Sequence, residues 1–268
     1  ITYGFLTFWA IMVLFPFYWM ILSSIKSYGD YNAEFIPKFI TLSPTLENYF
    51  NAFTAVPLAD YFANTLIFTL GTTAIMLVVT VLAAFAFARL EFKGRDLMFG
   101  ALLATMMIPG ELFTITNYAT VTKFGWMNTY TVLIVPFLVS VFYIYLLRQN
   151  FMQIPNELYL AAKVDGTSDL KYLWKVMVPL ALPTLISITI LKMMGAWNSY
   201  IWPRLVANDE AHRMITNGLR NAFTDTTGDV NYPQQMAAVA LVSLPLFLVF
   251  IFLRKYIMKG VSRSGIKG

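Results

Sequence analysis

The sequence predicts an all-α protein that crosses a membrane six times. Of its 268 residues, 58% are hydrophobic and only 12% are charged, and the mean hydropathy is +0.64. A water-soluble fold of this length has too little interior to hide so many apolar side chains. The apolar residues also gather in six runs, each near the roughly 20 residues that a helix needs to cross a hydrocarbon core of about 30 Å.

The six predicted spans belong to one transmembrane domain, residues 1–268, with no soluble module. The spans cover residues 5–25, 62–88, 97–115, 130–147, 178–202 and 236–258. The third run contains Pro109 and Gly110, which allow a break, a re-entrant path or part of a gate at that point. Two long loops, 26–61 and 203–235, are expected on one side of the membrane, and a loop of residues 149–177 on the other.

The distribution of basic residues predicts the orientation. The segments on the side of both termini carry twelve Lys and Arg residues, whereas the opposite loops carry six. Including acidic residues, the two sides have formal charges of +7 and −3. The positive-inside rule places the first side, and therefore both termini, in the cytoplasm. The basic balance thus reports orientation, because no basic run is dense enough to follow a nucleic-acid backbone.

The composition also excludes several kinds of site. The chain has no Cys and a single His, His212, which excludes disulfides, thiolate metal sites and multi-histidine metal centres. The predicted spans contain no paired carboxylates for acid–base chemistry, which argues against a membrane-embedded enzyme. A secondary carrier driven by ions remains a second class of function, although such carriers usually show repeated halves and buried carboxylates.

The cytoplasmic loop of residues 149–177 predicts a helix, a bend and a second helix. Pro155 suits the first helical position and Glu157 the first turn, where a carboxylate meets free N–H groups. Gly166 favours the left-handed conformation that ends helices, and Thr167 or Ser168 then provides a cap. Since Glu157 and Ala161 share one face, another surface can approach the backbone closely there. From the residues alone, a helix lying under the membrane is an equal alternative.

This loop resembles the EAA loop of permease subunits in bacterial ABC importers. The sequence "ELYLAAKVDGTSDLKYLWKVMVPLALP" has the family's Glu, paired Ala, Gly and later Leu-Pro in the expected order. The matching positions are Glu157, Ala161, Ala162, Asp165, Gly166, Pro179, Leu182 and Pro183. The segments "GWMNTYTVLIVP", "WNSYIWP" and the tail "KGVSRSGIKG" are similar to the carbohydrate-uptake subclass, which includes the smaller membrane subunit of maltose transporters. The tail has Ser-Arg-Ser where Thr-Ala-Gly is more common.

The resemblance implies a non-catalytic subunit of an ATP-driven importer. Its partners would be a second homologous permease, a dimer of ATPase subunits and an extracellular sugar-binding protein. ATP and Mg²⁺ would be bound by the ATPase, since this chain has no G-x-x-x-x-G-K-[ST] phosphate loop and no cofactor of its own. The ATPase-coupling residues would be Glu157, Ala161, Ala162, Asp165 and Gly166. The tail, Lys259–Gly268, would reach between the ATPase subunits, or it would bind anionic lipid headgroups.

The translocation path is expected near the end of the fifth span. Lys192 is a charge within a span, which usually faces a cavity or a partner. Lys192, Trp197, Asn198 and Tyr200 are therefore candidates for contact with a sugar, because aromatic rings pack on its C–H faces and polar groups bind its hydroxyls. Trp202 is expected in the interfacial aromatic belt. A mono- or oligosaccharide fits best, and glycerol phosphate is the alternative, with Lys192 and Arg204 meeting the phosphate.

Overall fold

Helices make up every regular element in the part of the chain that the computed structural model describes. The structure describes residues 2–219, 223 and 230–265, with side chains up to residue 252. The all-α prediction is confirmed. In chain order the elements are α1 (Thr2–Ser24), α2 (Tyr28–Ala33), α3 (Glu47–Ala55), α4 (Leu58–Arg89), α5 (Arg95–Thr105), η1 (Gly110–Phe113), α6 (Thr114–Lys123), α7 (Tyr130–Ile134), η2 (Val135–Phe137), α8 (Val141–Met152), α9 (Asn156–Val164), α10 (Asp169–Tyr172), the π-helical turn η3 (Leu173–Met177), α11 (Val178–Leu180), α12 (Leu182–Trp197), α13 (Ile201–Val206), η4 (Glu210–His212), α14 (Ile215–Gly218) and α15 (Tyr232–Gly265).

Three helices of the described residues are long and apolar enough to cross a membrane without a break, namely α1, α4 and the α15 segment Tyr232–Phe252. Three pairs of shorter helices pass the same test together, and counting each pair as one span gives six. The pairs are Arg95–Thr105 with Gly110–Lys123, Tyr130–Phe137 with Val141–Met152, and Asp169–Leu180 with Leu182–Trp197. These pairs occupy the regions of the third, fourth and fifth predicted spans.

The bends within the pairs lie at prolines and at irregular turns. The first pair bends by 83°, the second by 44° and the third by 80°. Pro109 precedes the short turn η1 at the first bend, and Pro136 lies in η2 at the second. At the third, the π turn η3 is followed by Pro179 and Pro183. Because proline lacks an N–H group and crowds the preceding turn, it interrupts helical hydrogen bonding at each of these points.

The chain divides into two compact units. The first comprises residues 1–65 and 213–248, and the second comprises residues 66–212 and 249–268. In the first unit, Ala52 of α3, Tyr61 of α4, Ile215 of α14 and Ala238 of α15 belong to one buried cluster. Gly218 lies directly against the Tyr61 ring, and a Cβ atom there would overlap with it. The close packing of α14 on α4 therefore requires glycine at this position.

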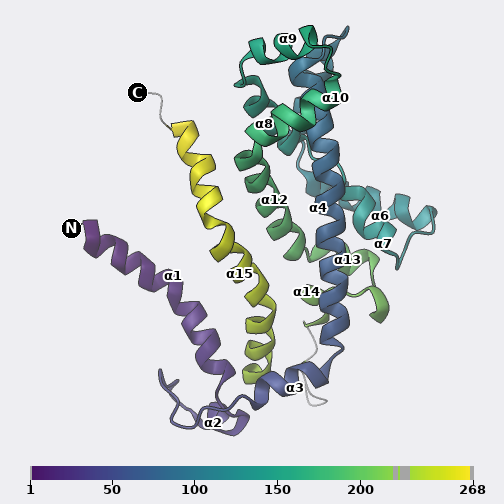
Figure 1. Cartoon of the computed structure of the whole chain (residues 1–268). Coiled ribbons are helices and arrows are strands. Elements are labelled where there is room, and N and C mark those ends of the chain that lie inside the picture. Colours follow the sequence, from purple (N-terminus) through teal and green to yellow (C-terminus); the bar gives the residue numbers. More distant parts are fainter. Residues whose placement is uncertain (1, 220–222, 224–229, 266–268) are drawn as a thin grey trace. The chain divides into compact units, whose positions relative to one another are not determined.

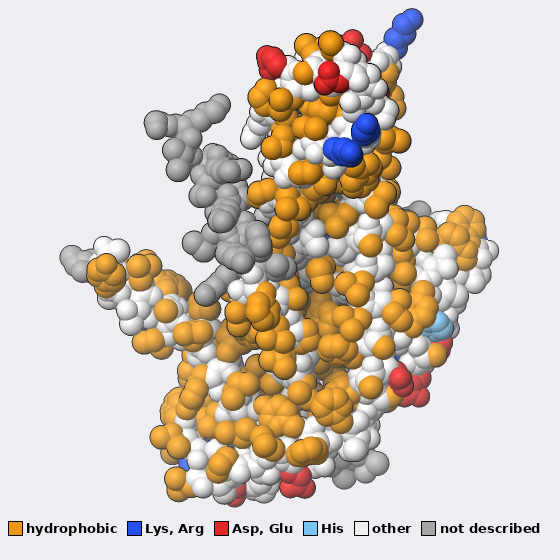
Figure 2. Space-filling model, viewed as in Figure 1, with side chains coloured by type: hydrophobic (Ala, Val, Ile, Leu, Met, Phe, Trp, Pro, Cys, Tyr) orange, Lys and Arg blue, Asp and Glu red, His pale blue; other side chains and the backbone are white. Residues whose placement is uncertain are grey.

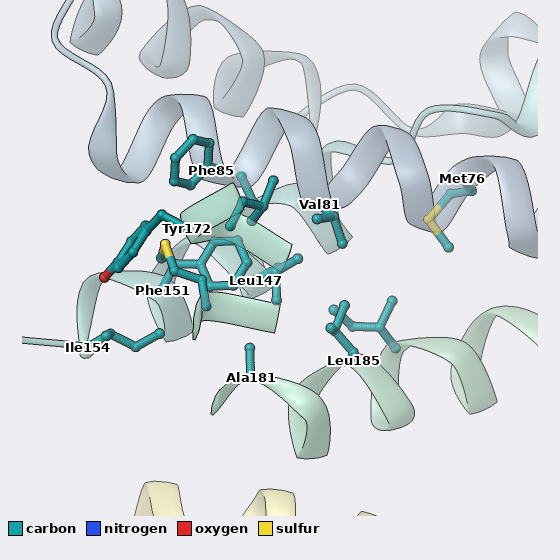
Figure 3. Close-up of a cluster of buried hydrophobic side chains, with 13 residues drawn as sticks. Met76, Val81, Phe85, Leu147, Phe151, Ile154, Tyr172, Ala181 and Leu185 are labelled. Carbon is teal, nitrogen blue, oxygen red and sulfur yellow. The ribbon is translucent and has the colours of Figure 1, made fainter. Parts of the chain in front are cut away.

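The second unit has its core between α4, α8 and the bent α10–α12 segment. Figure 3 shows Val81 and Phe85 of α4 facing Leu147 and Phe151 of α8, with Tyr172 beside them. This cluster holds the start of the 149–177 loop and the start of the fifth predicted span against the same helix. Hydrophobic side chains cover most of the face in Figure 2, as expected for surfaces that contact lipid or other membrane subunits.

One local prediction requires correction. Pro155 is the residue before the first turn of α9, with φ −55° and ψ 136°, and the helix begins at Asn156. Extended ψ at Pro155 leaves it outside the helix. In the loop of residues 26–61, Leu46 occupies the cap position of α3 and its side chain makes no capping hydrogen bond. The Thr45 hydroxyl nevertheless accepts a hydrogen bond of 3.1 Å from the Glu47 N–H in the first turn.

Candidate functional site

The helix α9 ends at Gly166 in a tight reversal of the backbone. Gly166 has φ +68°, the left-handed conformation. The Thr167 N–H donates to the Ala162 carbonyl at 2.8 Å, and the Gly166 N–H donates to the Lys163 carbonyl at 3.0 Å. These two bonds form a Schellman motif, which satisfies the last carbonyls of the helix. The predicted bend at Gly166 is present, and Ser168 is at the cap position of α10, without a side-chain hydrogen bond.

A cluster of Tyr159, Lys163 and Asp169, here called the bend clamp, joins the two sides of this reversal. The Lys163 Nζ lies 2.6 Å from the Asp169 Oδ1, and the Tyr159 hydroxyl donates to the same oxygen at 2.7 Å. Hydrogen bonds from Lys163 and Tyr159 lower the pKa of Asp169, and the hydrogen bond to Asp169 raises the pKa of Lys163. Both residues are therefore charged near neutral pH, which fixes α9 relative to α10.

Arg89, at the end of α4, holds the start of the same loop. Its guanidinium donates to the Phe151 carbonyl at 2.9 Å and also to the Ile154 carbonyl. A third contact, of 3.4 Å, reaches the Asn156 Oδ1 at the start of α9. Phe151 lies in the last turn of α8 and Ile154 follows it, so the cation lies at the C-terminal end of the helix, where it is favourable. As a result, α9 and α10 lie at the end of α4 that carries Arg89 (Figure 1).

One face of α9 is exposed and mostly apolar. Glu157, Leu160, Ala161 and Val164 recur at the spacing of one helical face, and all four are exposed, Val164 to 87%. Ala162 instead lies half-buried against the core cluster, because it follows Ala161 by one position and points to another side. Asp165 and Gly166 are exposed at the end of this face. We call the four residues the α9 face.

Two cavities lie near the far end of α12, both within the second unit. The larger has a volume of about 520 Å³ and is lined by Gly110, Glu111, Thr114, Asn117, Pro136, Phe137, Asn198, Ser199, Tyr200, Ile201 and Trp202. The smaller, of about 320 Å³, is lined by Phe68, Phe137, Val139, Ser140, Tyr143, Leu191, Lys192, Gly195, Ala196 and Ser199. Phe137 and Ser199 border both. Rings, amides and hydroxyls line these cavities together with the charged side chains of Glu111 and Lys192, the mixture of apolar walls and a few polar groups that small-molecule sites have.

The predicted path residues are distributed unevenly over these cavities. Asn198 and Tyr200 line the larger cavity, beyond the end of α12, and Lys192 lines the smaller one. The Lys192 ammonium donates to the Phe137 carbonyl at 3.3 Å. Trp197 is only 3% exposed and is absent from both linings. The structure therefore brings three of the four candidates to cavity walls.

Trp202 does not lie in an interfacial belt. Its side chain is 7% exposed, and its indole N–H donates to the Val132 carbonyl at 3.0 Å. The prediction is wrong because α12 ends at Trp197 and the chain turns before α13, which directs Trp202 against α7.

Comparison with known proteins decides the family. Residues 76–263 match the family described as binding-protein-dependent transport system inner membrane component. The chain belongs to this family. This inner membrane component is 30% identical to the trehalose/maltose transport system permease protein MalG of Thermococcus litoralis, over 97% of this chain and 93% of the relative. It is also 28% identical to the diacetylchitobiose uptake system permease protein NgcG of Streptomyces coelicolor, over 98% of this chain and 87% of the relative.

A solved structure shares the fold of this inner membrane component. It is a bacterial ABC transporter involved in the import of the acidic polysaccharide alginate, matched with a TM-score of 0.87 over 96% of this chain and 95% of that chain. At 22% sequence identity, this similarity concerns the fold alone. The sequence-based expectation of a membrane permease, a transport component without its own catalysis, agrees with the family.

The sequence analysis missed the residues that fix α9 and α10 in place. Arg89 was counted only as a charge for orientation, and Tyr159, Lys163 and Asp169 were given no role. A usable signal was present, since Tyr159 and Lys163 are four residues apart and therefore share one helical face. The side chains of the tail Lys259–Gly268 lie outside the described residues.

Proposed function

We propose that this chain is the permease subunit of an ATP-driven importer for a sugar, specifically an oligosaccharide, with both termini in the cytoplasm. The observation that carries the proposal is a continuous connection from the α9 face to the cavity walls. From α9 the chain passes through the clamped bend and through α10, η3 and α11 into α12. The far end of α12 supplies Lys192, and Asn198 and Tyr200 follow it. A displacement of α9 is thereby transmitted to the cavities.

In this proposal a separate ATPase dimer binds ATP and Mg²⁺ and contacts the α9 face. Ala161 lets the partner approach the helix closely, and the exposed apolar side chains around it provide area to bury. Glu157 accepts hydrogen bonds or an ion pair from the ATPase. Gly166 and the bend clamp keep the angle to α10 fixed, so that movement of α9 is passed on and not absorbed in the loop.

The translocation path is completed by a second, homologous permease, and an extracellular binding protein delivers the substrate. The sugar assignment is supported by the sugar substrates named for the two relatives above. The larger cavity, at about 520 Å³, has the size of a small-molecule site. Its Asn198, Asn117 and Tyr200 side chains offer the hydrogen-bonding groups that sugar hydroxyls need.

Charge reversal on the α9 face tests the coupling role. The assembled complex in lipid vesicles is assayed for substrate-stimulated ATP hydrolysis and for uptake. Glu157→Lys is expected to lose both stimulation and uptake while still inserting in the membrane. Glu91→Lys is the matched control, since Glu91 is also an exposed glutamate on the predicted cytoplasmic side. Normal stimulated hydrolysis in Glu157→Lys would refute the coupling role.

The class of transporter and its substrate need a separate measurement. Uptake of radiolabelled disaccharides, longer oligosaccharides and glycerol phosphate is compared in vesicles with and without ATP. Uptake of an oligosaccharide that requires ATP supports the proposal. Uptake by this chain alone without ATP would identify an ion-driven carrier, and preference for glycerol phosphate would replace the sugar assignment.

A further inference from the structure

The loop after α1 exposes an unusual run of large apolar side chains. Phe35, Ile36, Phe39, Ile40 and Leu42 are all exposed, Phe35 to 100% and Leu42 to 98%. Isolated apolar side chains on a surface are ordinary, but a contiguous group of this size marks a contact surface. We call residues 34–42 the hook. All of its contacts described below lie within the first compact unit.

Downstream residues hold the chain on both sides of the hook to the end of α1. The Thr45 N–H donates to the Ile25 carbonyl at 2.8 Å. The Asn48 amide donates to the Ser24 carbonyl at 2.9 Å and to the Lys26 carbonyl at 2.6 Å. Carbonyls at a helix end have no partner within the helix, and here the returning chain supplies them. The loop is therefore a closed structure with a defined position on α1.

A buried ion pair closes the base of the hook. The Lys26 side chain is 1% exposed, and its ammonium lies 2.7 Å from the Glu34 Oε2 and 2.9 Å from the Lys38 carbonyl. Glu34 in turn accepts the Lys38 N–H at 3.0 Å. The hydrogen bond from Lys26 lowers the pKa of Glu34. The Lys26 and Glu34 charges and the Lys38 backbone groups at the base of the hook thus bond to one another, and the apolar side chains of the hook remain exposed.

Contacts of Phe39 show that the hook folds back along α1. The Phe39 ring lies 5.8 Å from the Trp19 ring and 6.3 Å from the Phe15 ring. The Tyr18 hydroxyl donates to the Phe39 carbonyl. Trp19 and Phe15 precede the last residue of α1 by about 7 to 14 Å at the helical rise. The hook therefore lies beside the part of α1 that would enter the membrane. Backbone carbonyls at that depth need hydrogen-bond donors, and the Tyr18 hydroxyl provides one for Phe39.

We propose that the hook inserts its apolar side chains into the membrane interface beside α1, in the outer leaflet for the orientation given above. We favour lipid over a protein partner because the hook lies along α1. This helix is a candidate span, and only 6% of its most apolar segment is buried within the chain. Trp19 and Tyr18 are residue types that anchor spans at the interface. Lys38 is exposed at the base, where a long cationic side chain extends toward headgroups.

The test measures lipid exposure of single sites in the assembled complex. The chain has no Cys, so Ile36→Cys, Ile40→Cys and Leu42→Cys each carry one spin label, and the parent complex gives the background. Collision with oxygen, which partitions into lipid, is compared with collision with a water-soluble nickel chelate in vesicles. Asn32→Cys, an exposed polar position of α2, is the matched control outside the hook.

The three hook labels are expected to favour oxygen and the Asn32 label to favour nickel. Stronger nickel collision at the hook would place it in water and overturn the proposal. Low collision with both reagents would show that a second permease covers the hook, and a change only after adding the binding protein would assign the surface to that partner. Either result also overturns the proposal. None of these outcomes depends on sugar transport.

Discussion

Tyr159 and Tyr172 are neighbouring rings, with centroids 5.1 Å apart, that use their hydroxyls differently. The Tyr159 hydroxyl donates to Asp169 across the bend, whereas the buried Tyr172 hydroxyl has no hydrogen-bond partner among the described residues. Removing the two hydroxyls separately therefore distinguishes the bend clamp from ring packing.

Tyr159→Phe is expected to reduce the amount of substrate transported per ATP by about two- to fivefold, since a hydrogen bond to a partly exposed carboxylate contributes about 1 kcal/mol at most. Tyr172→Phe, which makes the same chemical change in the adjacent ring, is expected to leave this ratio unchanged. Transport and ATP hydrolysis are measured together in vesicles. Equal effects of the two variants would contradict a role for the clamp.

Gly166 is constrained by its backbone conformation and not by space. Its φ is +68°, and nothing lies within 4 Å of a Cβ atom built there. The left-handed conformation costs about 1–2 kcal/mol for most residues, less for Asn and most for β-branched residues. Transport per ATP is therefore expected to fall in the order Gly, Asn, Ala, Val at this position. Gly100→Ala is the control, because Gly100 also has open space but lies in the regular helix α5.

A result in which Gly166→Val couples as well as Gly166→Asn would show that the bend is not held in this conformation during transport. The comparison needs only the ratio of transport to hydrolysis, so differences in expression among the variants do not enter it.

At the scale of elements, α12 and the turns around it bring a charge to a cavity. The Lys192 ammonium contacts the Phe137 carbonyl and lies 5.5 Å from the centre of the Phe137 ring. Lys192→Met keeps most of the apolar stem and removes the ammonium. We expect substrate affinity in uptake assays to fall by about three- to tenfold, the loss of one hydrogen bond. Leu191→Met, a change in the adjacent residue of the same cavity wall, is expected to have little effect.

Unchanged affinity and rate in Lys192→Met would show that this side chain serves packing alone. A similar loss in both variants would instead show that the cavity wall responds to any change of shape.

The sequence predicts elements well where one local property decides them. Apolar runs identify the regions of all six candidate spans, and Gly166 identifies the bend, because hydropathy and left-handed glycine act locally. The 80° bend between Asp169–Leu180 and Leu182–Trp197 falls near the start of the fifth predicted span, residues 178–202, for which the sequence analysis predicts no bend. Its angle depends on packing against α4 and α8, which composition does not encode. The contacts of Arg89 with residues about 60 positions away were beyond prediction for the same reason.

At the scale of the whole molecule, topology depends on whether the bent pair α5 and α6 crosses the membrane. An 83° bend fits either a broken span or a re-entrant loop that returns to its side of entry. The contacts of Arg89 and the charges both favour crossing. Arg89 donates to the Phe151 and Ile154 carbonyls, which brings the end of α4 and the start of the α9 loop to the same side. Arg89 and Lys93 precede the pair and Arg95 is its first residue, whereas Lys123 is its last residue and no basic residue lies between it and α7. A re-entrant pair would place the α9 loop, with its four basic residues counted from Arg148, on the side opposite to residues 89–95, against the positive-inside rule.

Three single-cysteine variants test this topology in a chain that has no Cys of its own. Asn32→Cys, Glu91→Cys and Phe124→Cys are all at exposed positions and are treated with a maleimide that does not cross membranes. In intact cells we expect labelling at Asn32 and Phe124 but not at Glu91, and the reverse in inverted vesicles. If Phe124 labels together with Glu91, the α5–α6 pair is re-entrant and the chain crosses five times, which would place its two termini on opposite sides. Labelling of Glu91 alone in intact cells would instead mean that the chain crosses six times in the inverted orientation. The two results are distinct because the distribution of basic residues predicts the orientation, whereas the path of the α5–α6 pair decides whether the number of crossings is even or odd.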